Sequence, residues 1–496
     1  MRSGQKRGQR AGGRQRKRQG HLAPAQAGER APSDPLSDGA AVRTAAAVAT
    51  AAAPPTREES AAAAPAWLDY LLPGALCVMA LVLFLPRLGT PREYIQDEVY
   101  HAYTAAQYLQ GNADAYLWNT TAPPGVAYEW THPPLGKLLI AAGVALFGDN
   151  AFGWRYASAL FGTIGLAIAY GLGLRLTRRR AIAVLGAALL LADGLYFVQS
   201  RTGMPDIFVL VFMTGALVAF YGYLTAPPGG VRWPMVRTGV LLGLAIATKW
   251  NAAYASALIA LVVLWRLYRL WWARRWLSPR RGELPAGVRE HLLWLPLGLV
   301  ALPLAIYALS YVPFFLTGHS VSQFTELQRQ MYYYHTHLKE THAYQSQWWS
   351  WPLALRPVWY YTTRSGDLVA NVYANGNPLL YWAFLPAVVW VGRRWWGERN
   401  AALIVLATGF FGQWLPWALS PRISFVYHFL PAVPFGCLAV ATALLELWGK
   451  HGRWRAVAIG YAALVAFAFA FFFPIYAAVP QTAARFDLRL WLPSWR

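Results

Sequence analysis

The sequence predicts an all-α polytopic membrane protein of about eleven transmembrane helices. Of its 496 residues, 56% are hydrophobic and only 13% are charged, and the mean hydropathy is +0.29. Apolar runs of about 20 residues recur along the chain, and a helix of that length crosses the hydrocarbon core of a bilayer. Many of the 25 Trp residues lie at the ends of these runs, where an amphipathic ring suits the membrane interface.

The predicted spans follow one another along most of the chain. They cover residues 67–86, 153–174, 181–199, 203–224, 235–250, 252–271, 292–313, 378–394, 400–419, 425–447 and 455–477. The boundary near Lys249 is the least defined, because the two short runs there could also form one long helix.

Basic clusters predict the orientation of these spans. Eleven Lys and Arg residues precede the first span, which places the N-terminus in the cytoplasm. Every second connection then carries basic residues: Arg178, Arg179 and Arg180; Arg232 and Arg237; Arg274, Arg275, Arg280 and Arg281; Arg393, Arg394 and Arg399; Lys450, Arg453 and Arg455. With eleven spans, this alternation places the C-terminus outside.

The chain divides into four predicted parts. They are a disordered basic cytoplasmic tail at 1–65, an N-terminal transmembrane catalytic module at 66–313 that includes an outer loop at 87–152, a second outer loop at 314–377, and a C-terminal transmembrane module at 378–496. The composition of the tail cannot bury a core. Within the first outer loop, residues 97–110 and 133–147 predict short surface helices, too short to span.

Charge and cysteine usage exclude several classes of protein. The net charge of +22 lies in the tail and in short loops, which indicates membrane topology and contact with anionic lipid, and not a nucleic-acid partner. The two cysteines, Cys77 and Cys437, lie inside apolar runs, so neither a disulfide scaffold nor a Cys-based zinc site follows. The sequence contains no nucleotide-binding glycine loop and no nucleophile elbow.

Adjacent carboxylates follow the first span at Asp97 and Glu98. Near lipid they lose solvation and repel each other, so at least one pKa should rise, and such an acid could take a proton from a hydroxyl nucleophile. The pair could instead hold a divalent cation, or Asp97 and Glu98 could simply favour the first turn of a helix.

Basic residues on the predicted outer side are the second candidate feature. Arg201, Lys249 and Arg422 lie at the outer ends of spans, where charge is costly and often functional. Arg and Lys suit a phosphate, although pairing with a nearby acid such as Asp206 or Asp193 would explain them equally well.

Two further motifs carry polar residues. In HPPLGK, Lys137 could contact a phosphate or could be a lysine that extends from a rigid turn toward the interface. In the second outer loop, His335, His337 and His342 lie close in sequence, but this spacing is a weak metal signal, and surface or substrate-contacting histidines are favoured. We predict no metal and no cofactor.

The chain resembles the bacterial protein O-mannosyltransferases, the dolichyl-phosphate-mannose-protein mannosyltransferase family of the GT-C class. The resemblance is carried, in order, by DEVYHAY, THPPLGKLLIA, DGLYFVQSRTGMPD, LAIATKWNA, WWSWPLALRPVWYY, GNPLLYW and SPRISFVYHFLPAVPF. Residues 1–65 are not covered. The second outer loop is too short for the large β-trefoil domain that eukaryotic relatives carry there.

The resemblance implies a GT-C fold and a reaction. Mannose would pass from a polyprenyl-phosphate carrier to Ser or Thr hydroxyls of exported proteins, with inversion, at the outer face of a bacterial plasma membrane. Asp97 of the acidic motif would be the general base, and Arg201 of the QSR motif would lie near the donor phosphate. Charge and topology alone add Lys249, Arg422 and His428 to the donor site. Membrane lipids and the protein export machinery are the other expected partners.

Two alternatives stay open. A related lipid-phosphate-sugar transferase acting on a lipid or glycan acceptor would have almost the same site. A lipid flippase or transporter belongs to a different class, but transporters usually show repeated halves and polar groups near the midplane, which this sequence lacks.

Overall fold

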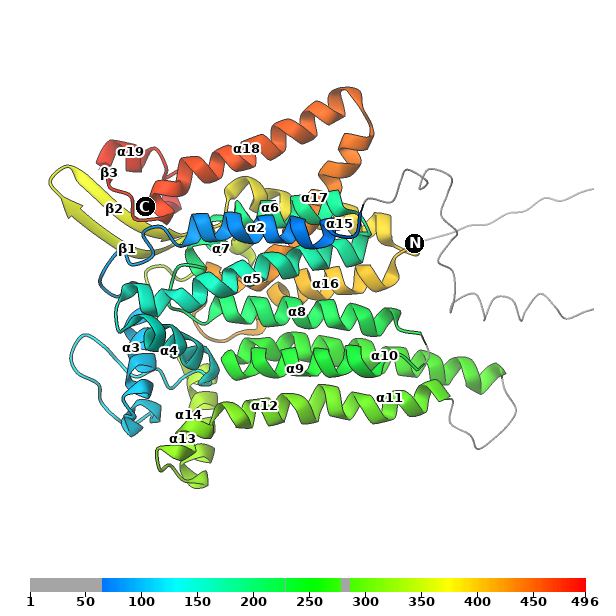
Figure 1. Ribbon diagram of the computed structural model, residues 1–496, viewed down its shortest axis with the longest axis horizontal. Coiled ribbons are helices and arrows are strands. Elements are labelled where there is room, and N and C mark those ends of the chain that lie inside the picture. The colour runs from blue at the N-terminus through cyan, green and yellow to red at the C-terminus, as the bar shows by residue number, and fades with distance from the viewer. Residues whose placement is uncertain (1–64, 228, 278–285) are drawn as a thin grey trace, which may run out of the picture. The chain divides into compact units, whose positions relative to one another are not determined.

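The computed structural model describes residues 65–227, 229–277 and 286–496. The predicted tail, apart from residue 65, and the predicted cytoplasmic arginines Arg280 and Arg281 lie outside the described residues. Within residues 65–496, long helices run side by side, and the two predicted outer loops gather at one end of them, at the left in Figure 1. We call this the loop end of the bundle.

In the described part of the N-terminal half, all regular secondary structure is helical. Its elements are α2 (Leu68–Phe84), α3 (Glu98–Leu109), the 3-10 helix η2 (Ala113–Tyr116), α4 (Leu135–Phe147), α5 (Ala151–Thr177), α6 (Arg180–Leu191), α7 (Gly194–Gln199), α8 (Asp206–Thr225), α9 (Arg232–Thr248), the 3-10 helix η3 (Trp250–Ala252) and α10 (Ala253–Leu277).

The C-terminal half adds helices and a small sheet. Its elements are α11 (Ala286–Pro296), the π-helical η4 (Leu297–Ala301), α12 (Leu302–Ser310), α13 (Val312–Leu316), α14 (Val321–His337), η5 (Trp348–Leu353), β1 (Val358–Ser365), β2 (Leu368–Ala374), α15 (Pro378–Trp395), α16 (Asn400–Trp414), η6 (Leu415–Leu419), η7 (Val426–Ala432), α17 (Val433–Gly449), α18 (Gly452–Tyr476), β3 (Gln481–Thr482), α19 (Ala483–Asp487) and η8 (Pro493–Trp495).

The prediction of a mostly helical membrane protein is confirmed. Among the described residues, seven helices are long and apolar enough to cross a membrane, and shorter apolar helices such as α2 and α6 accompany them. Every predicted span overlaps at least one helix. The count of eleven spans and the sides on which the two termini lie stay predictions.

The chain breaks at Lys249, where the sequence left one or two helices open. Helix α9 ends at Thr248, Lys249 adopts extended backbone with φ −159° and ψ 134°, and η3 begins at Trp250. The two-helix interpretation is therefore correct. The break places the lysine at the end of α9, among the polar residues of the loop end.

The all-α prediction is wrong at a three-stranded antiparallel sheet in order β1-β2-β3. Strands β1 and β2 form a hairpin within the second outer loop, and Leu368 and Val369 of β2 pair with Thr482 and Gln481 of β3. The run VWYYTT is rich in β-branched and aromatic residues, which favour strands. This run lies in a loop without hydrophobic periodicity, and strand propensity alone did not predict a strand there.

The hairpin holds the segment that leads to the acidic pair. The backbone N–H of Gln96 donates to the carbonyl of Tyr360 on β1 at 3.1 Å. The side chain of Gln199, at the end of α7, donates to the Tyr360 hydroxyl at 2.7 Å. The sheet thereby fixes the backbone next to Asp97 to the core.

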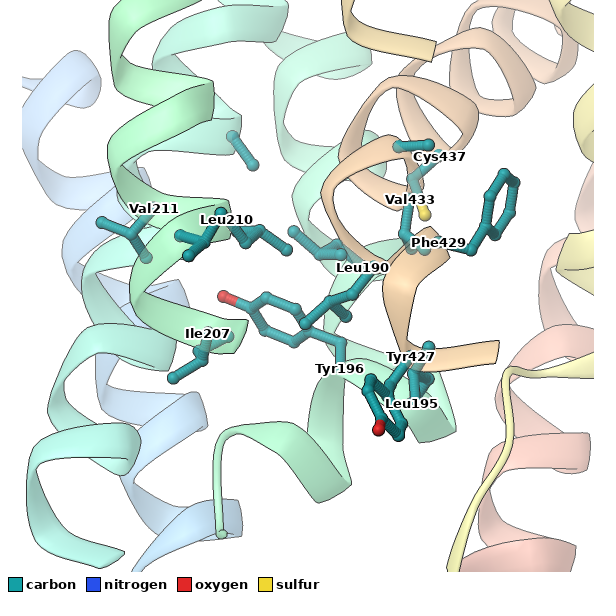
Figure 2. Packing of buried hydrophobic residues seen from close by; sticks show 14 of the residues in the cluster. Leu190, Leu195, Tyr196, Ile207, Leu210, Val211, Tyr427, Phe429, Val433 and Cys437 are labelled. Atoms are coloured by element: carbon teal, nitrogen blue, oxygen red, sulfur yellow. The ribbon is translucent and has the colours of Figure 1, made fainter. Parts of the chain in front are cut away.

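A hydrophobic core lies between α6, α7, α8, η7 and α17. Figure 2 shows the ring of Tyr196 between Ile207 on α8 and Leu190 on α6, and its hydroxyl donates to the carbonyl of Gly162 on α5. Because these side chains are fully or almost fully buried, they hold the ends of α7, α8 and η7 in fixed positions. Polar residues at those ends build the site.

Candidate functional site

A cavity of about 400 Å³ opens at the loop end of the bundle. Its polar lining comes from five separate parts of the chain. These polar residues are Gln96, Asp97, Tyr100, His101, Tyr128, Glu129, Thr131, His132, Lys249, Tyr334, His342, Arg422, Tyr427 and His428. Of the predicted site residues, Asp97, Lys249, Arg422 and His428 share this cavity.

Asp97 is the carboxylate that faces the cavity without a cation in hydrogen-bond contact. It occupies the N-cap position of α3, and its Oδ1 accepts a hydrogen bond from the side chain of Gln96 at 3.2 Å. Burial raises the pKa of Asp97 to about 6, Lys249 opposes the rise, and Asp206 and Glu129 add to it. A carboxylate with such a pKa can accept a proton near neutral pH.

Glu98 points away from the cavity into the protein. It is fully buried, and its two oxygens meet Nε and Nη2 of Arg155, each at 2.8 Å. The same carboxylate accepts hydrogen bonds from the backbone of Ile95 at 3.0 Å and of Gly203 at 2.8 Å. All its acceptor positions serve the fold, so the structure gives Glu98 no contact with a substrate in the cavity.

Two buried arginines hold the segment between α2 and Asp97. Arg155 donates to the carbonyls of Leu88, Pro91 and Glu93. Arg201 donates to carbonyls of residues 83, 84, 86 and 87. The sequence predicted Arg201 near the donor phosphate. In the structure, Arg201 does not line the cavity. Its guanidinium satisfies the carbonyls at the end of α2 instead.

Lys249 lies opposite Asp206 at the cavity wall. Its Nζ donates to Oδ1 of Asp206 at 2.9 Å and lies 5.6 Å from the centre of the Tyr427 ring. The alternative that a nearby acid pairs with the lysine is therefore correct. The ammonium nevertheless keeps further N–H donors, since only one is used by Asp206.

Arg422 is held by a histidine from the second outer loop. Its Nη1 hydrogen-bonds to Nδ1 of His335, while Nε2 of the same imidazole contacts the carbonyl of Thr131 at 2.7 Å. A carbonyl only accepts, so Nε2 carries the proton and Nδ1 accepts from the arginine. Burial and Arg422 lower the pKa of His335 to about 4, which keeps the ring neutral in this role.

His428 presents a hydrogen-bond donor to the cavity. Its Nδ1 accepts from the backbone N–H of Phe425 at 3.0 Å, so the proton of the neutral ring is on Nε2. The imidazole stacks on Trp417 with ring centres 4.0 Å apart. Packing and the backbone bond therefore fix the ring that the sequence placed near a span entrance.

Lys137 forms an ion pair with Glu129, a second carboxylate in the cavity wall. Its Nζ lies 2.6 Å from Oε2 of Glu129 and also donates to the carbonyls of Glu129 and His132, each at 2.7 Å. Burial opposes ionisation of Glu129, but Lys137 and His101 outweigh it and lower the pKa to about 2. Lys137 therefore has its donors satisfied and does not line the cavity.

Several site residues escaped the sequence analysis. Glu129 precedes the HPPLGK motif by three positions, and His101 lies three positions after Glu98, so both could have been found beside motifs already noted. Arg155 lies inside an apolar segment, where an isolated charge was its only sequence signal, whereas Asp206 was expected only as a possible partner of the basic residues. His335 stacks on His132 with ring centres 5.2 Å apart, a contact between residues about 200 positions apart.

The three histidines of the second outer loop do not converge on a metal. His335 binds Arg422, His337 stacks on Tyr333, and His342 lines the cavity. No group of three or more His, Cys, Asp or Glu side chains in the described part of the chain could hold a metal ion.

Comparison with known structures shows the fold. A protein O-mannosyltransferase complex of S. cerevisiae, solved with its sugar donor bound, aligns with a TM-score of 0.72 at 16% identity, covering 86% of this chain and 92% of that chain. ArnT from Cupriavidus metallidurans, solved with undecaprenyl phosphate, aligns with a TM-score of 0.52 at 20% identity, covering 82% and 71%. The predicted GT-C architecture agrees with these neighbours.

Comparison with known sequences shows the family. The polyprenol-phosphate-mannose–protein mannosyltransferase of Mycobacterium tuberculosis is 30% identical, covering 82% of this chain and 87% of the relative. The enzyme of the same name from Corynebacterium glutamicum is 28% identical, covering 82% and 89%. The family model for dolichyl-phosphate-mannose-protein mannosyltransferase matches residues 74–317, and the model for the C-terminal four-span region of protein O-mannosyltransferase matches residues 320–495. The chain belongs to the dolichyl-phosphate-mannose-protein mannosyltransferase family and is a membrane glycosyltransferase.

Proposed function

We propose that the cavity transfers mannose from a polyprenyl-phosphate-mannose donor to Ser or Thr hydroxyls of exported polypeptides. One observation carries the proposal: Asp97 shares a single cavity with Lys249, Arg422 and His428. A proton acceptor thus lies beside three donors that suit a phosphate. The names of the mycobacterial relatives supply the donor and the protein acceptor.

The reaction uses these groups as follows. The acceptor hydroxyl oxygen attacks the anomeric carbon while its proton passes to Asp97. The bond from that carbon to the phosphate oxygen breaks, and the lipid phosphate leaves with the electron pair. Attack from the face opposite the leaving group inverts the anomeric configuration. The departing phosphate gains negative charge, which Lys249, Arg422 and the Nε2–H of His428 stabilise. The scheme requires no metal.

Three other predicted site residues receive supporting roles in this proposal. Glu98 and Arg201 fix the backbone that presents Asp97, and Lys137 fixes the wall residue Glu129. None of them lines the cavity. We therefore assign them to positioning and not to contact with the donor.

We further propose that the cavity faces outward from a bacterial plasma membrane. The basic residues at the end of α5 and the start of α9 lie at the end of the bundle opposite α3 and α4 (Figure 1). The positive-inside rule assigns the basic end to the cytoplasm. This arrangement makes the loop end, with its cavity, accessible to polypeptides that emerge from the export machinery.

A lipid or glycan acceptor is the nearest alternative function. An undecaprenyl-phosphate aminoarabinose transferase from Pseudomonas aeruginosa is 28% identical over 68% of this chain. The similarity to a protein mannosyltransferase, which covers 82% of this chain, favours the protein acceptor. A flippase, the alternative from a different class, would not explain a carboxylate with a raised pKa among phosphate-binding groups.

A reconstituted assay tests the proposal. Purified protein in liposomes receives polyprenyl-phosphate mannose and a Thr-containing peptide, and mass spectrometry measures a hexose added to the peptide. A matched peptide with Thr replaced by Val is the control. Transfer only to a lipid acceptor would establish the alternative acceptor, and movement of the donor across the bilayer without transfer would establish the transporter.

A further inference from the structure

A second, larger recess lies on the side of the bundle, remote from the catalytic cavity. This groove has a volume of about 890 Å³ and is formed by α2, α5, α8 and α9. Its deeper walls include apolar and small residues such as Ile168, Gly171, Val218 and Leu241. Its mouth lies near the end of α5 and the start of α9, opposite the loop end. No element of the reaction described above uses it.

Three arginines line the mouth of this groove. They are Arg175 near the end of α5, Arg178 immediately after it and Arg237 on α9. All three side chains are exposed, and none contacts an acid among the described residues. The guanidinium groups therefore present a concentrated positive charge beside an apolar recess.

Among the described residues that line the groove, the single acid, Asp69, is already neutralised. Asp69 accepts hydrogen bonds from Nε of Arg180 at 2.6 Å and from Nη2 at 2.9 Å. The hydroxyl of Tyr170 also donates to this carboxylate, at 3.3 Å. The charge of Arg175, Arg178 and Arg237 is thus left for a ligand from outside the described chain.

The walls leave room for a hydrocarbon chain. A Cβ atom added to Gly171 would meet no heavy atom within 4 Å, so the C-terminal part of α5 opens onto free space at this position. On α8, Gly215 and Ala219 also line the groove, and their small side chains take up little of its space. The recess thus combines an apolar channel with a cationic mouth, the two features that an acyl chain and a phosphate headgroup require.

We propose that this groove binds an anionic phospholipid, with the phosphate at the three arginines and an acyl chain between α5 and α8. Charge complementarity selects this occupant over the segment that precedes α2. Residues 1–64 contain eleven Lys and Arg against five Asp and Glu, so that segment is repelled by the same arginines. The site is separate from the donor cavity and does not depend on the proposed reaction.

Native mass spectrometry of the full-length protein in detergent tests the site. The probes are phosphatidylglycerol, zwitterionic phosphatidylcholine and glycerol 3-phosphate, which has the charge without the chains. The charge variant combines Arg175→Gln, Arg178→Gln and Arg237→Gln. Its matched control removes the same charge at three exposed positions, Lys450 directly after α17 and Arg453 and Arg455 at the start of α18.

We expect phosphatidylglycerol to bind wild type more tightly than phosphatidylcholine, and glycerol 3-phosphate not to be retained. The triple groove variant should weaken binding of phosphatidylglycerol on the order of 100-fold, and a single arginine change about fivefold. The control triple variant should bind phosphatidylglycerol as wild type does. Equal binding by the two triple variants would overturn the proposal.

A second pair of variants tests the acyl channel without changing charge. Gly171→Leu places a side chain in the groove, whereas Gly460→Leu places one on α18, where a Cβ also meets nothing within 4 Å. Gly171→Leu should lose phosphatidylglycerol while Gly460→Leu retains it. If Gly171→Leu binds as wild type does, no chain occupies the groove. A melting temperature equal to that of wild type shows that each variant is folded.

Discussion

At the residue scale, the four buried or half-buried carboxylates at the site differ in whether a cation contacts them. Glu98 is neutralised by Arg155, Glu129 by Lys137 and Asp206 by Lys249. Asp97 has a glutamine as its hydrogen-bond partner. Three acids are thus each paired with a cation, and the fourth, Asp97, has no cation in hydrogen-bond contact and is able to gain a proton.

Asp97→Asn should lower the rate of transfer by about 10²–10⁴-fold, the usual worth of a general base, and leave donor binding unchanged. In wild type the base form of Asp97 exists above its pKa of about 6. The rate should therefore fall about tenfold for each pH unit below 6. Single-turnover rates between pH 4.5 and 8 measure both effects.

The exposed Asp367, in the turn of the β1–β2 hairpin, supplies the matched control Asp367→Asn, which should behave as wild type. Wild-type turnover by Asp97→Asn would remove Asp97 from the role of base. A rate independent of pH through this range would show that proton transfer to Asp97 does not limit the reaction.

His335→Ala should raise the KM for the lipid donor about tenfold, because Arg422 loses the imidazole that holds it, and a hydrogen bond to a charged group contributes about 1.5–3 kcal/mol. The KM for the peptide should change little. Steady-state kinetics with each substrate varied separately measure the difference. His337→Ala, two positions away and exposed, is the control. Equal effects on both KM values would indicate general damage to the cavity.

At the element scale, the segment between α2 and α3 has no regular structure of its own and is held by two arginines from other helices. Arg155 on α5 and Arg201 after α7 together bind carbonyls along residues 83–93. Backbone carbonyls buried without partners would be costly. The position of Asp97 therefore depends on helices that do not touch the substrate.

Arg155→Met should lower the stability of the protein by about 3–5 kcal/mol, because it leaves Glu98 as a buried charge without its partner. The melting temperature of the purified protein measures the loss. The double variant Glu98→Gln with Arg155→Met should recover part of it, since no unpaired charge remains. Breaking the exposed pair of Glu326 and Arg329 with Glu326→Gln is the control and should leave the melting temperature nearly unchanged. No recovery in the double variant would mean that the carbonyl contacts of Arg155 dominate.

The sequence predicts elements better than it predicts contacts. Hydrophobic run length located the helices, and the motif DEVYHAY located α3 with Asp97 at its start, because these signals are local. Arg201 illustrates what the sequence leaves open. A lone arginine at a span end has the same sequence signal whether it binds phosphate or caps carbonyls, and only the fold places residues 83–87 beside it. Strand β3 likewise could not be predicted, because its two residues are too few for a sequence pattern.

At the scale of the whole molecule, the site lies at one end of the helical bundle. Arg175, Arg178 and Arg237, which contact no acid among the described residues, lie at the other end. This separation predicts which parts of the protein each side of the membrane can reach. In a variant without Cys77 and Cys437, Arg364→Cys in the hairpin should react with a membrane-impermeant maleimide added outside intact cells. Arg178→Cys, at the end of α5, should react only after permeabilisation. Labelling of both positions from one side would contradict the proposed orientation.

The small sheet has a consequence for how the enzyme matures. Strand β1 holds the backbone beside Asp97, but the hairpin is completed only by residues more than a hundred positions later in the chain: Gln481 and Thr482 pair with β2, and the Trp495 carbonyl accepts from Tyr373 and Trp359. Contacts between such distant positions form slowly. A partly synthesised chain would thus contain every proposed donor-binding residue, with Asp97 already held through Arg155 and Arg201, before the sheet beside Asp97 is complete. We therefore expect the site to reach its final geometry late in biogenesis.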